Sequence, residues 1–157
     1  MALSAYLRLV AAGGPIPGSV TRTGLVDTIE VSAVDHQVNA ALDARGLPTR
    51  PYVHQAIVVT IGQDRSWPLL WRALDTTERL TTFRLDFWRP TTSGTEEQFY
   101  TISLTNAYIS GIKMVMLNNR APVASGIETR HRVSFTYDTI EWTWQPTLGA
   151  ATGTWPP

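Results

Sequence analysis

Hydrophobic and polar residues alternate over most of the chain, and this period of two is typical of a β-strand with one buried face. Clusters of glycine, proline and small polar residues interrupt the alternation, as turns do. The segments that alternate are 3–11, 25–38, 53–61, 80–88, 100–116 and 133–144. The pattern therefore predicts a mainly β protein.

The alternation changes phase near Thr105–Asn106, again near Gly111, and once more at Asp138–Thr139. A period-two pattern changes phase only where an extra residue is inserted, so these positions predict β-bulges or bends. Long strands with repeated bulges are typical of sheets that coil into barrels. We predict two sheets that form a bent, closed or nearly closed β-barrel.

A single short helix is predicted at residues 66–76, beside the barrel. Ser66 suits the N-cap and Pro68 suits the first turn, where no backbone N–H is needed. The apolar residues that follow at helical spacing are Leu70, Ala73 and Leu74.

Two segments are predicted to lie outside the regular structure. Residues 43–52 are expected to form an exposed, extended loop, because Gly46, Pro48 and Pro51 preclude regular structure there. The end of the chain, 147–157, is predicted to be a flexible tail.

The length of 157 residues favours one domain over 1–157, large enough to bury a core without metals or crosslinks. Only 17% of the residues are charged, and a surface with few charges suggests cover by another protein, although a β-rich composition alone also explains it. The formal net charge is zero. That balance argues against nucleic acid as a partner and favours contact between copies.

The chain contains no cysteine, which excludes disulfides and thiolate chemistry and fits folding in a reducing cytoplasm. The start, Met1–Val10, alternates and lacks a basic leader, so it predicts a strand rather than a signal peptide. No apolar run approaches the roughly 20 residues of a membrane span, so no membrane insertion is expected.

Candidate chemistry is sparse. His36, His54 and His131 are isolated from one another in sequence, and no carboxylate stands beside them at metal-ligand spacing. The adjacent Glu96 and Glu97 would point to opposite faces of a strand, which is poor geometry for an acid–base pair. The sequence predicts no active site, no metal and no cofactor, and hence a protein that is not an enzyme.

The aromatic residues leave a second function open. Tryptophans could stack on sugar rings, as in a monomeric carbohydrate-binding β-module, although packing in a core or an interface is their commoner use. The six are Trp67, Trp71, Trp88, Trp142, Trp144 and Trp155.

Three ordered segments, 54–74, 99–113 and 133–143, resemble conserved blocks of the Hcp family, the tube proteins of bacterial type VI secretion. In the first, a strand that begins at a histidine leads through Asp-Arg-Ser-Trp-Pro into a helix; the second reads Tyr-Thr-Ile-Ser-Leu-Thr-Asn-Ala, and the third reads Phe-Thr-Tyr-Asp-Thr-Ile-Glu-Trp-Thr. The residues that carry the resemblance are His54, Thr60, Asp64, Ser66, Pro68, Tyr100, Asn106, Phe135, Tyr137 and Trp142.

The resemblance implies a barrel that closes into hexameric rings, and rings that stack into a tube. A contractile sheath and a spike protein would be its partners, effector proteins its cargo, and the type VI apparatus its route of secretion. It also implies that the loop 43–52 contacts the next ring or subunit. The candidate contact residues are Asp43, Arg45, Leu47, Arg50 and Tyr52.

The chain departs from the family pattern at Ala56, Ile61 and Trp144, where the family commonly has proline, lysine and histidine, and in the tail 153–157, which lacks two acidic residues. These differences concern expected surfaces and bear on stacking and cargo preference. A tube protein of a related phage-like contractile device is an alternative.

Overall fold

The computed structural model describes residues 3–155, which form twelve β-strands and a single α-helix. The prediction of a mainly β chain with one short helix is confirmed. The elements are β1 Ser4–Ala11, β2 Gly14–Ile16, β3 Ile29–Asp35, β4 Val38–Leu42, β5 Pro48–His54, β6 Ile57–Ile61, α1 Trp67–Asp75, β7 Leu80–Pro90, β8 Glu96–Thr105, β9 Tyr108–Val115, β10 Arg130–Thr136, β11 Thr139–Trp144 and β12 Gly149–Thr154.

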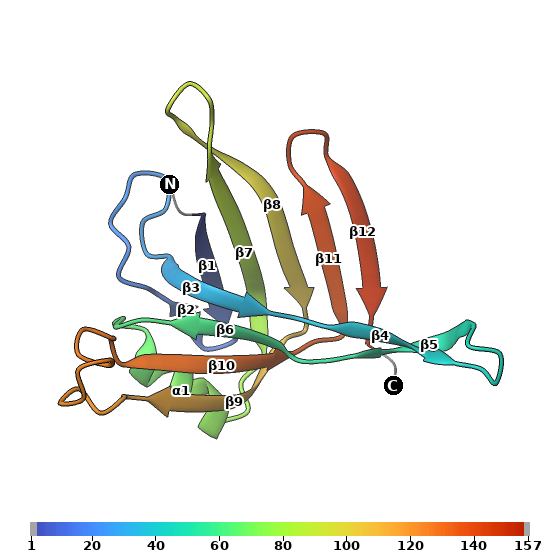
Figure 1. Cartoon of the computed structure of the whole chain (residues 1–157), viewed down its shortest axis with the longest axis horizontal. Coiled ribbons are helices and arrows are strands. Elements are labelled where there is room, and N and C mark those ends of the chain that lie inside the picture. The colour runs from blue at the N-terminus through green and yellow to red at the C-terminus, as the bar shows by residue number, and fades with distance from the viewer. Residues whose placement is uncertain (1–2, 156–157) are drawn as a thin grey trace.

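One large antiparallel sheet has the strand order β12-β11-β8-β7-β1-β3-β6-β10-β9, with β2 paired to β1, and β4 and β5 form a separate two-stranded sheet. The large sheet is folded over, so that strands β1, β7, β8, β11 and β12 run crosswise to β3, β6, β9 and β10 (Figure 1). The apolar faces of the two halves enclose the core between them.

The predicted class, a bent and closed or nearly closed β architecture, is consistent with the structure, but the two predicted sheets are halves of one sheet that does not close. The halves belong to one sheet, and no strand pairing joins its terminal strands, β9 and β12, within the described residues. The chain itself connects the halves on that side, because β8 runs on into β9 and β10 runs on into β11. The sheet is thus strongly coiled but open.

The predicted phase changes lie at these two corners. Leu104 and Ala107 are both buried although they are three positions apart, an odd spacing that breaks the alternation, and Asn106 between them takes a positive φ of 50°. Tyr137 and Ile140 repeat the same spacing around Asp138. The Nδ2 of Asn106 donates to Asp138 Oδ2 at 2.9 Å, so one hydrogen bond joins the two corners.

The bulge predicted near Gly111 is also present, because the β9–β10 register shifts between Ser134 and Phe135. Beyond it, Met114 at the end of β9 and Met116 just after the strand are 56% and 62% exposed, so this part of the alternating segment does not contribute to the core.

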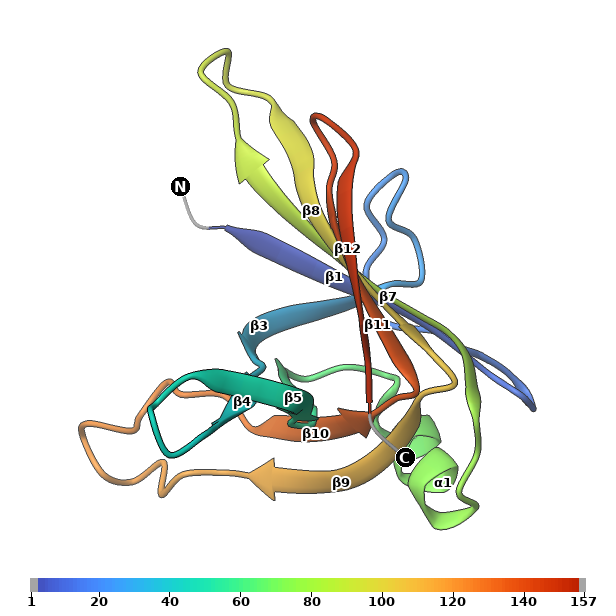
Figure 2. The ribbon, with the colours of Figure 1, turned by 90° about the vertical axis from the view of Figure 1, so that its right-hand side faces the viewer.

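The core contains residues from both halves and from the helix. Phe83 and Phe135 meet edge to face with ring centroids 4.9 Å apart, an arrangement that aromatic rings prefer. Leu70 and Ala73 of α1 are buried against this core, and Figure 2 shows the helix at the end of the molecule beside β9. In residues 3–155, no helix has the length and apolar character that crossing a membrane requires.

The helix begins where the sequence predicted, but its cap differs. Ser66 occupies the N-cap position, yet its hydroxyl makes no capping bond. The Oδ1 of Asp64 accepts a hydrogen bond from the Ser66 backbone N at 2.8 Å instead, so the aspartate orders the entry to the helix. Pro68 lies in the first turn, as predicted.

The expectation that Gly46, Pro48 and Pro51 preclude regular structure is wrong. Residues 48–54 form β5, which pairs with β4 in a hairpin. The register jumps from Ala40–Tyr52 to Ala41–Thr49, so a bulge takes up the two residues before Tyr52. A proline, which has no backbone N–H, is tolerated in a two-stranded hairpin because one edge of each strand has no partner strand and needs no hydrogen-bond donor.

The flexible tail predicted for 147–157 is wrong over 149–154, which pair with β11 as β12; residues 156 and 157 lie outside the described residues. The segment is rich in glycine and alanine, which propensity disfavours in strands. Small residues are nevertheless required here, because a Cβ at Gly153 would lie 2.9 Å from both His54 Cε1 and Trp142 Cη2.

Gly18 provides a test of the turn after β2. A Cβ there would meet the backbone oxygen of Thr28 at 2.1 Å, whereas one at Gly111 would meet nothing within 4 Å. We expect Gly18→Ala to lower the free energy of unfolding, measured in urea, by about 1–3 kcal/mol. Gly111→Ala should change it by less than about 0.5 kcal/mol. Equal effects of the two substitutions would show that the turn is not as tight as described.

Candidate functional site: the projecting hairpin, its root and the polar face

The β4–β5 hairpin projects from the body of the molecule (Figures 1 and 2). It carries large apolar side chains in solvent: Leu42 is 67% exposed, Leu47 57%, Tyr52 43% and Val53 49%. Isolated two-stranded hairpins are marginally stable in water. Contact with another chain that covers these apolar side chains would therefore stabilise the hairpin.

The candidate contact residues divide into two roles. The carboxylate of Asp43 accepts hydrogen bonds from the backbone N atoms of Arg45 and Leu47, at 2.8 and 2.9 Å, so it orders the turn. Arg45 and Leu47 are exposed at that turn. The guanidinium of Arg50 lies 5.5 Å from the ring centroid of Tyr52, a cation–π contact on the outside of the hairpin.

A cluster of aromatic side chains fixes the root of the hairpin to the large sheet. The hydroxyl of Tyr137 is 2.8 Å from His36 Nε2 and 2.9 Å from His54 Nδ1. His36 precedes β4 and His54 ends β5, so both stems of the hairpin meet at one hydroxyl. We call His36, His54 and Tyr137 the root cluster.

Two tryptophans and the last strand cover the root cluster. Trp155 lies edge-on to Tyr137 with ring centroids 5.0 Å apart, and Trp142 lies 6.2 Å from His36. Gly153 of β12 passes directly over His54. Between the hairpin, Trp142 and β12 there is a hollow of about 350 Å³.

Burial makes the charged forms of the root cluster unfavourable. Desolvation lowers the pKa of His36, and the neighbouring His54 lowers it further, while Asp35 opposes both effects. Desolvation also lowers the pKa of His54 and raises the pKa of Tyr137 to about 12. At neutral pH all three side chains are therefore uncharged and share hydrogen bonds.

The opposite face of the sheet from the core is polar across four adjacent strands. The registers of β1, β7, β8 and β11 align its residues in two rows. These rows are Tyr6, Asp86, Thr101 and Thr143, and Arg8, Arg84, Ser103 and Glu141. We call this surface the polar face.

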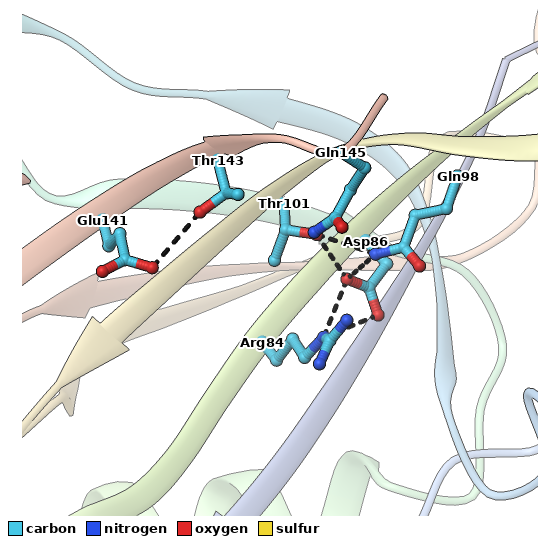
Figure 3. A network of polar contacts seen from close by, with 7 residues as sticks. All are labelled: Arg84, Asp86, Gln98, Thr101, Glu141, Thr143 and Gln145. Atoms are coloured by element: carbon cyan, nitrogen blue, oxygen red, sulfur yellow. Dashed lines mark hydrogen bonds and ion pairs between the residues drawn. The ribbon is translucent and has the colours of Figure 1, made fainter. Parts of the chain in front are cut away.

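Asp86 is the centre of a hydrogen-bond network on the polar face (Figure 3). Its Oδ1 accepts from Gln98 Nε2 at 2.6 Å, from Thr101 Oγ1 at 2.8 Å and from Arg84 Nε at 2.9 Å. Gln145 Nε2 donates to Thr101 Oγ1 at 2.9 Å. The network joins β7, β8 and the end of β11 through side chains as well as backbone.

The residues that carried the family resemblance do not form one site. His54, Tyr137 and Trp142 meet at the hairpin root, and Asn106 joins the two corners. The others lie apart in the fold, where Phe135 and Tyr100 pack in or against the core, Asp64, Ser66 and Pro68 begin the helix, and Thr60 lies on β6. Most of them therefore maintain the fold.

Within residues 3–155, no group of three or more histidine or acidic side chains converges in a way that could hold a metal ion. Among the tryptophans of residues 3–155, Trp71 and Trp144 rank as exposed apolar residues. Trp71 donates to His131 Nε2, and Arg89 covers Trp144 at 5.2 Å.

Sequence reasoning missed that His36 and His54 converge, and it missed Gly153, Trp155 and Asp86. The first pair left a signal, because the two histidines flank a proline- and glycine-rich segment on either side. A hairpin between them would have brought them together. The others left none, since their roles depend on contacts between elements distant in the chain.

Comparison with known proteins gives consistent results. The family model described as "Type VI secretion system effector, Hcp" matches residues 6–144. The "Major exported protein" of Pseudomonas aeruginosa is 36% identical over 139 residues, which cover 86% of this chain and 81% of that protein.

Solved structures share the whole fold. A crystal structure of an Hcp protein superposes with a TM-score of 0.91 at 28% identity, covering 99% of both chains. The secreted protein Hcp3 from Pseudomonas aeruginosa has a TM-score of 0.79 at 26% identity, covering 99% of this chain and 100% of that one.

The histidines predict how stability depends on pH. Burial lowers the pKa of His36, His54 and His131, so below about pH 6.5 the unfolded chain binds more protons than the folded one. We expect the free energy of unfolding to be constant above about pH 7.5 and to fall as the pH drops through 6.5 toward the folded-state pKa values, by up to about 1.4 kcal/mol per pH unit for each histidine. Urea unfolding between pH 7.5 and 5.5 measures this; stability that is constant or rises in this range would contradict it.

Proposed function

The chain belongs to the Hcp family of type VI secretion proteins, and we propose that it is a structural subunit of the inner tube of that secretion system. In this proposal it does no chemistry. It assembles with copies of itself into hexameric rings, and the rings stack into a conduit for effector proteins.

The observation that carries the proposal is the β4–β5 hairpin. Four of its large apolar side chains are 43–67% exposed, and the root cluster attaches its stems to the body. At about 25 cal/mol per Å² of apolar surface, covering these side chains by a second copy would stabilise both the hairpin and the assembly.

The open edges of the large sheet support a ring. Strands β9 and β12 each present an edge that no strand in residues 3–155 pairs with, and such edges tend to pair with other chains unless they are covered. A projecting hairpin that contacts a different surface of the next copy makes a heterologous contact, and heterologous contacts close into rings when the rotation allows. The hexameric number follows from the family resemblance.

We propose that the polar face lines the lumen. It carries hydroxyl, amide and charged side chains of both signs, and the Asp86 network holds several of them in place. A rigid surface of this kind offers hydrogen bonds to a passing protein without a large apolar patch that would retain it.

The remaining steps follow from the family. The chain would be made in the bacterial cytoplasm and leave through the type VI apparatus. The contractile sheath would surround the tube and the spike protein would cap it. The differences at Ala56 and Trp144 would then tune the contacts between rings and with cargo. Ile61 would not, because it is fully buried in the core, so the expectation that it lies on a surface is wrong.

The mass in solution tests assembly. Native mass spectrometry and light scattering across a wide range of concentrations should show a species of about six times the 17.4 kDa chain, because apolar hairpin surface and two sheet edges are buried in the ring. A strict monomer at high concentration that binds oligosaccharides would overturn the proposal in favour of a sugar-binding module.

The hairpin contact has its own test. Arg50→Glu should weaken ring stacking, seen as loss of the fastest-sedimenting species, because it reverses a charge on the contact surface. Since Arg50 is exposed, stability should change by less than about 1 kcal/mol. Arg8→Glu is the matched control, an exposed charge reversal on the polar face, and should leave stacking intact. Equal effects of both variants, or unfolding of the Arg50 variant, would contradict the assignment.

A further inference from the structure

A single buried hydroxyl group attaches both stems of the projecting hairpin to the large sheet. Tyr137 is 4% exposed and His54 6% exposed, so solvent does not compete for their hydrogen bond. The stems also meet each other, through a bond of 2.9 Å from Gln55 N to Gln37 O. The direction in which the hairpin leaves the body therefore depends on the root cluster.

The hydrogen-bond chemistry of the root cluster requires neutral histidines. A tyrosine hydroxyl has one proton to donate and lone pairs to accept with. It can donate to one imidazole nitrogen and accept from the other ring, if one histidine offers a bare nitrogen and the other an N–H. Both bonds, at 2.8 and 2.9 Å, are then satisfied.

Protonation removes this match. When the histidine with the bare nitrogen gains a proton, both rings present donors to the same oxygen, and the hydroxyl proton loses its acceptor inside a buried site. A buried donor without a partner is unfavourable, because it has given up its hydrogen bonds to water and gained none in the protein. If both rings are protonated, two positive charges also share one oxygen atom.

The surrounding groups do not compensate for two positive charges. Asp35 on β3 favours a charged His36, but the Asp138 carboxylate is engaged with Asn106. Tyr52 is the titratable side chain of β5 beside the hollow. The neighbours from β11, β12 and the chain end are Trp142, Gly153 and Trp155, none of which titrates.

We propose that Tyr137 is the positioning residue of the contact hairpin and that protonation of His36 and His54 in mildly acidic solution releases the hairpin from the large sheet. A released hairpin retains its own strand pairing but no longer points in one direction. A further consequence rests on the proposed function: acid weakens the ring contacts that the hairpin makes.

Spin labels can measure release directly, because the chain has no cysteine of its own. Labels on Arg45→Cys at the hairpin turn and Lys113→Cys on β9 report the distance between hairpin and body, and both positions are exposed. Labelled chains diluted in excess unlabelled chain give distances within one copy, whatever the assembly. Histidine ring signals in NMR spectra follow the protonation of His36, His54 and His131 separately.

We expect one narrow distance distribution at pH 7.5. A broad second population should grow as His36 and His54 titrate, below the ordinary histidine pKa of 6.5 because burial lowers the pKa of both, and it should reverse on return to pH 7.5. A difference of one pKa unit between attached and released states changes the release equilibrium about tenfold. Circular dichroism should show that the sheet stays folded throughout.

Tyr137→Phe removes the shared hydroxyl but keeps the ring. It should broaden the distribution at pH 7.5 and abolish further change on acidification. If that variant fails to fold, His36→Gln, at the half-buried end of the cluster, should reduce the acid response severalfold. A distribution that stays narrow after both root histidines are protonated, or that changes only when His131 titrates, would overturn the proposal.

The outcome is separable from that of the proposed function. Rings that form while the hairpin never moves with pH would refute the release but leave the tube assignment intact. Release in a chain that stays monomeric would support the root cluster as a device and refute the tube.

Discussion

The fold depends on a change of phase in two long strands at adjacent points. At Asn106 and Asp138 the strands β8–β9 and β10–β11 turn from one half of the sheet to the other, and the hydrogen bond between these side chains joins the two corners. Because of these corners, one continuous sheet covers its own apolar face. Without them the core residues of β7 and β10, Phe83 and Phe135, could not meet.

The same corner places the functional elements. Tyr137 immediately precedes Asp138, so the turn of the strand presents its hydroxyl to both stems of the hairpin. Folding the sheet also turns its polar face outward over β1, β7, β8 and β11, and it leaves β9 and β12 as open edges. The proposed contact surface, lumen wall and edges between copies are thus all consequences of how one sheet bends.

Local sequence determines much of this structure. The alternation of apolar and polar residues identified most strands. The phase changes located the corners, because buried side chains two positions apart continue a strand, whereas an odd spacing between them requires a bulge or a bend. The helix at 66–76 was predictable from Ser66, Pro68 and its apolar face, although Asp64 orders its start. The ordered motifs identified the family.

Other features depend on contacts that local patterns do not reveal. β12 was not predicted, because glycine has a low strand propensity. Gly153 is present for another reason, the close approach of the backbone to His54 and Trp142. β5 was not predicted, because its prolines are tolerated only where the strand has a bulge or an unpaired edge, and the local sequence does not show either. The root cluster joins residues 83 and 101 positions apart, and sheet closure depends on how strands order themselves in space.

Electron cryomicroscopy of the assembled chain would show which surfaces meet between copies. We expect a ring in which residues 48–54 of each copy lie against a neighbouring copy, and in which the face carrying Asp86 and Thr101 surrounds the lumen. A ring whose hairpins stand free in solvent, or whose lumen is lined by another face, would contradict this expectation.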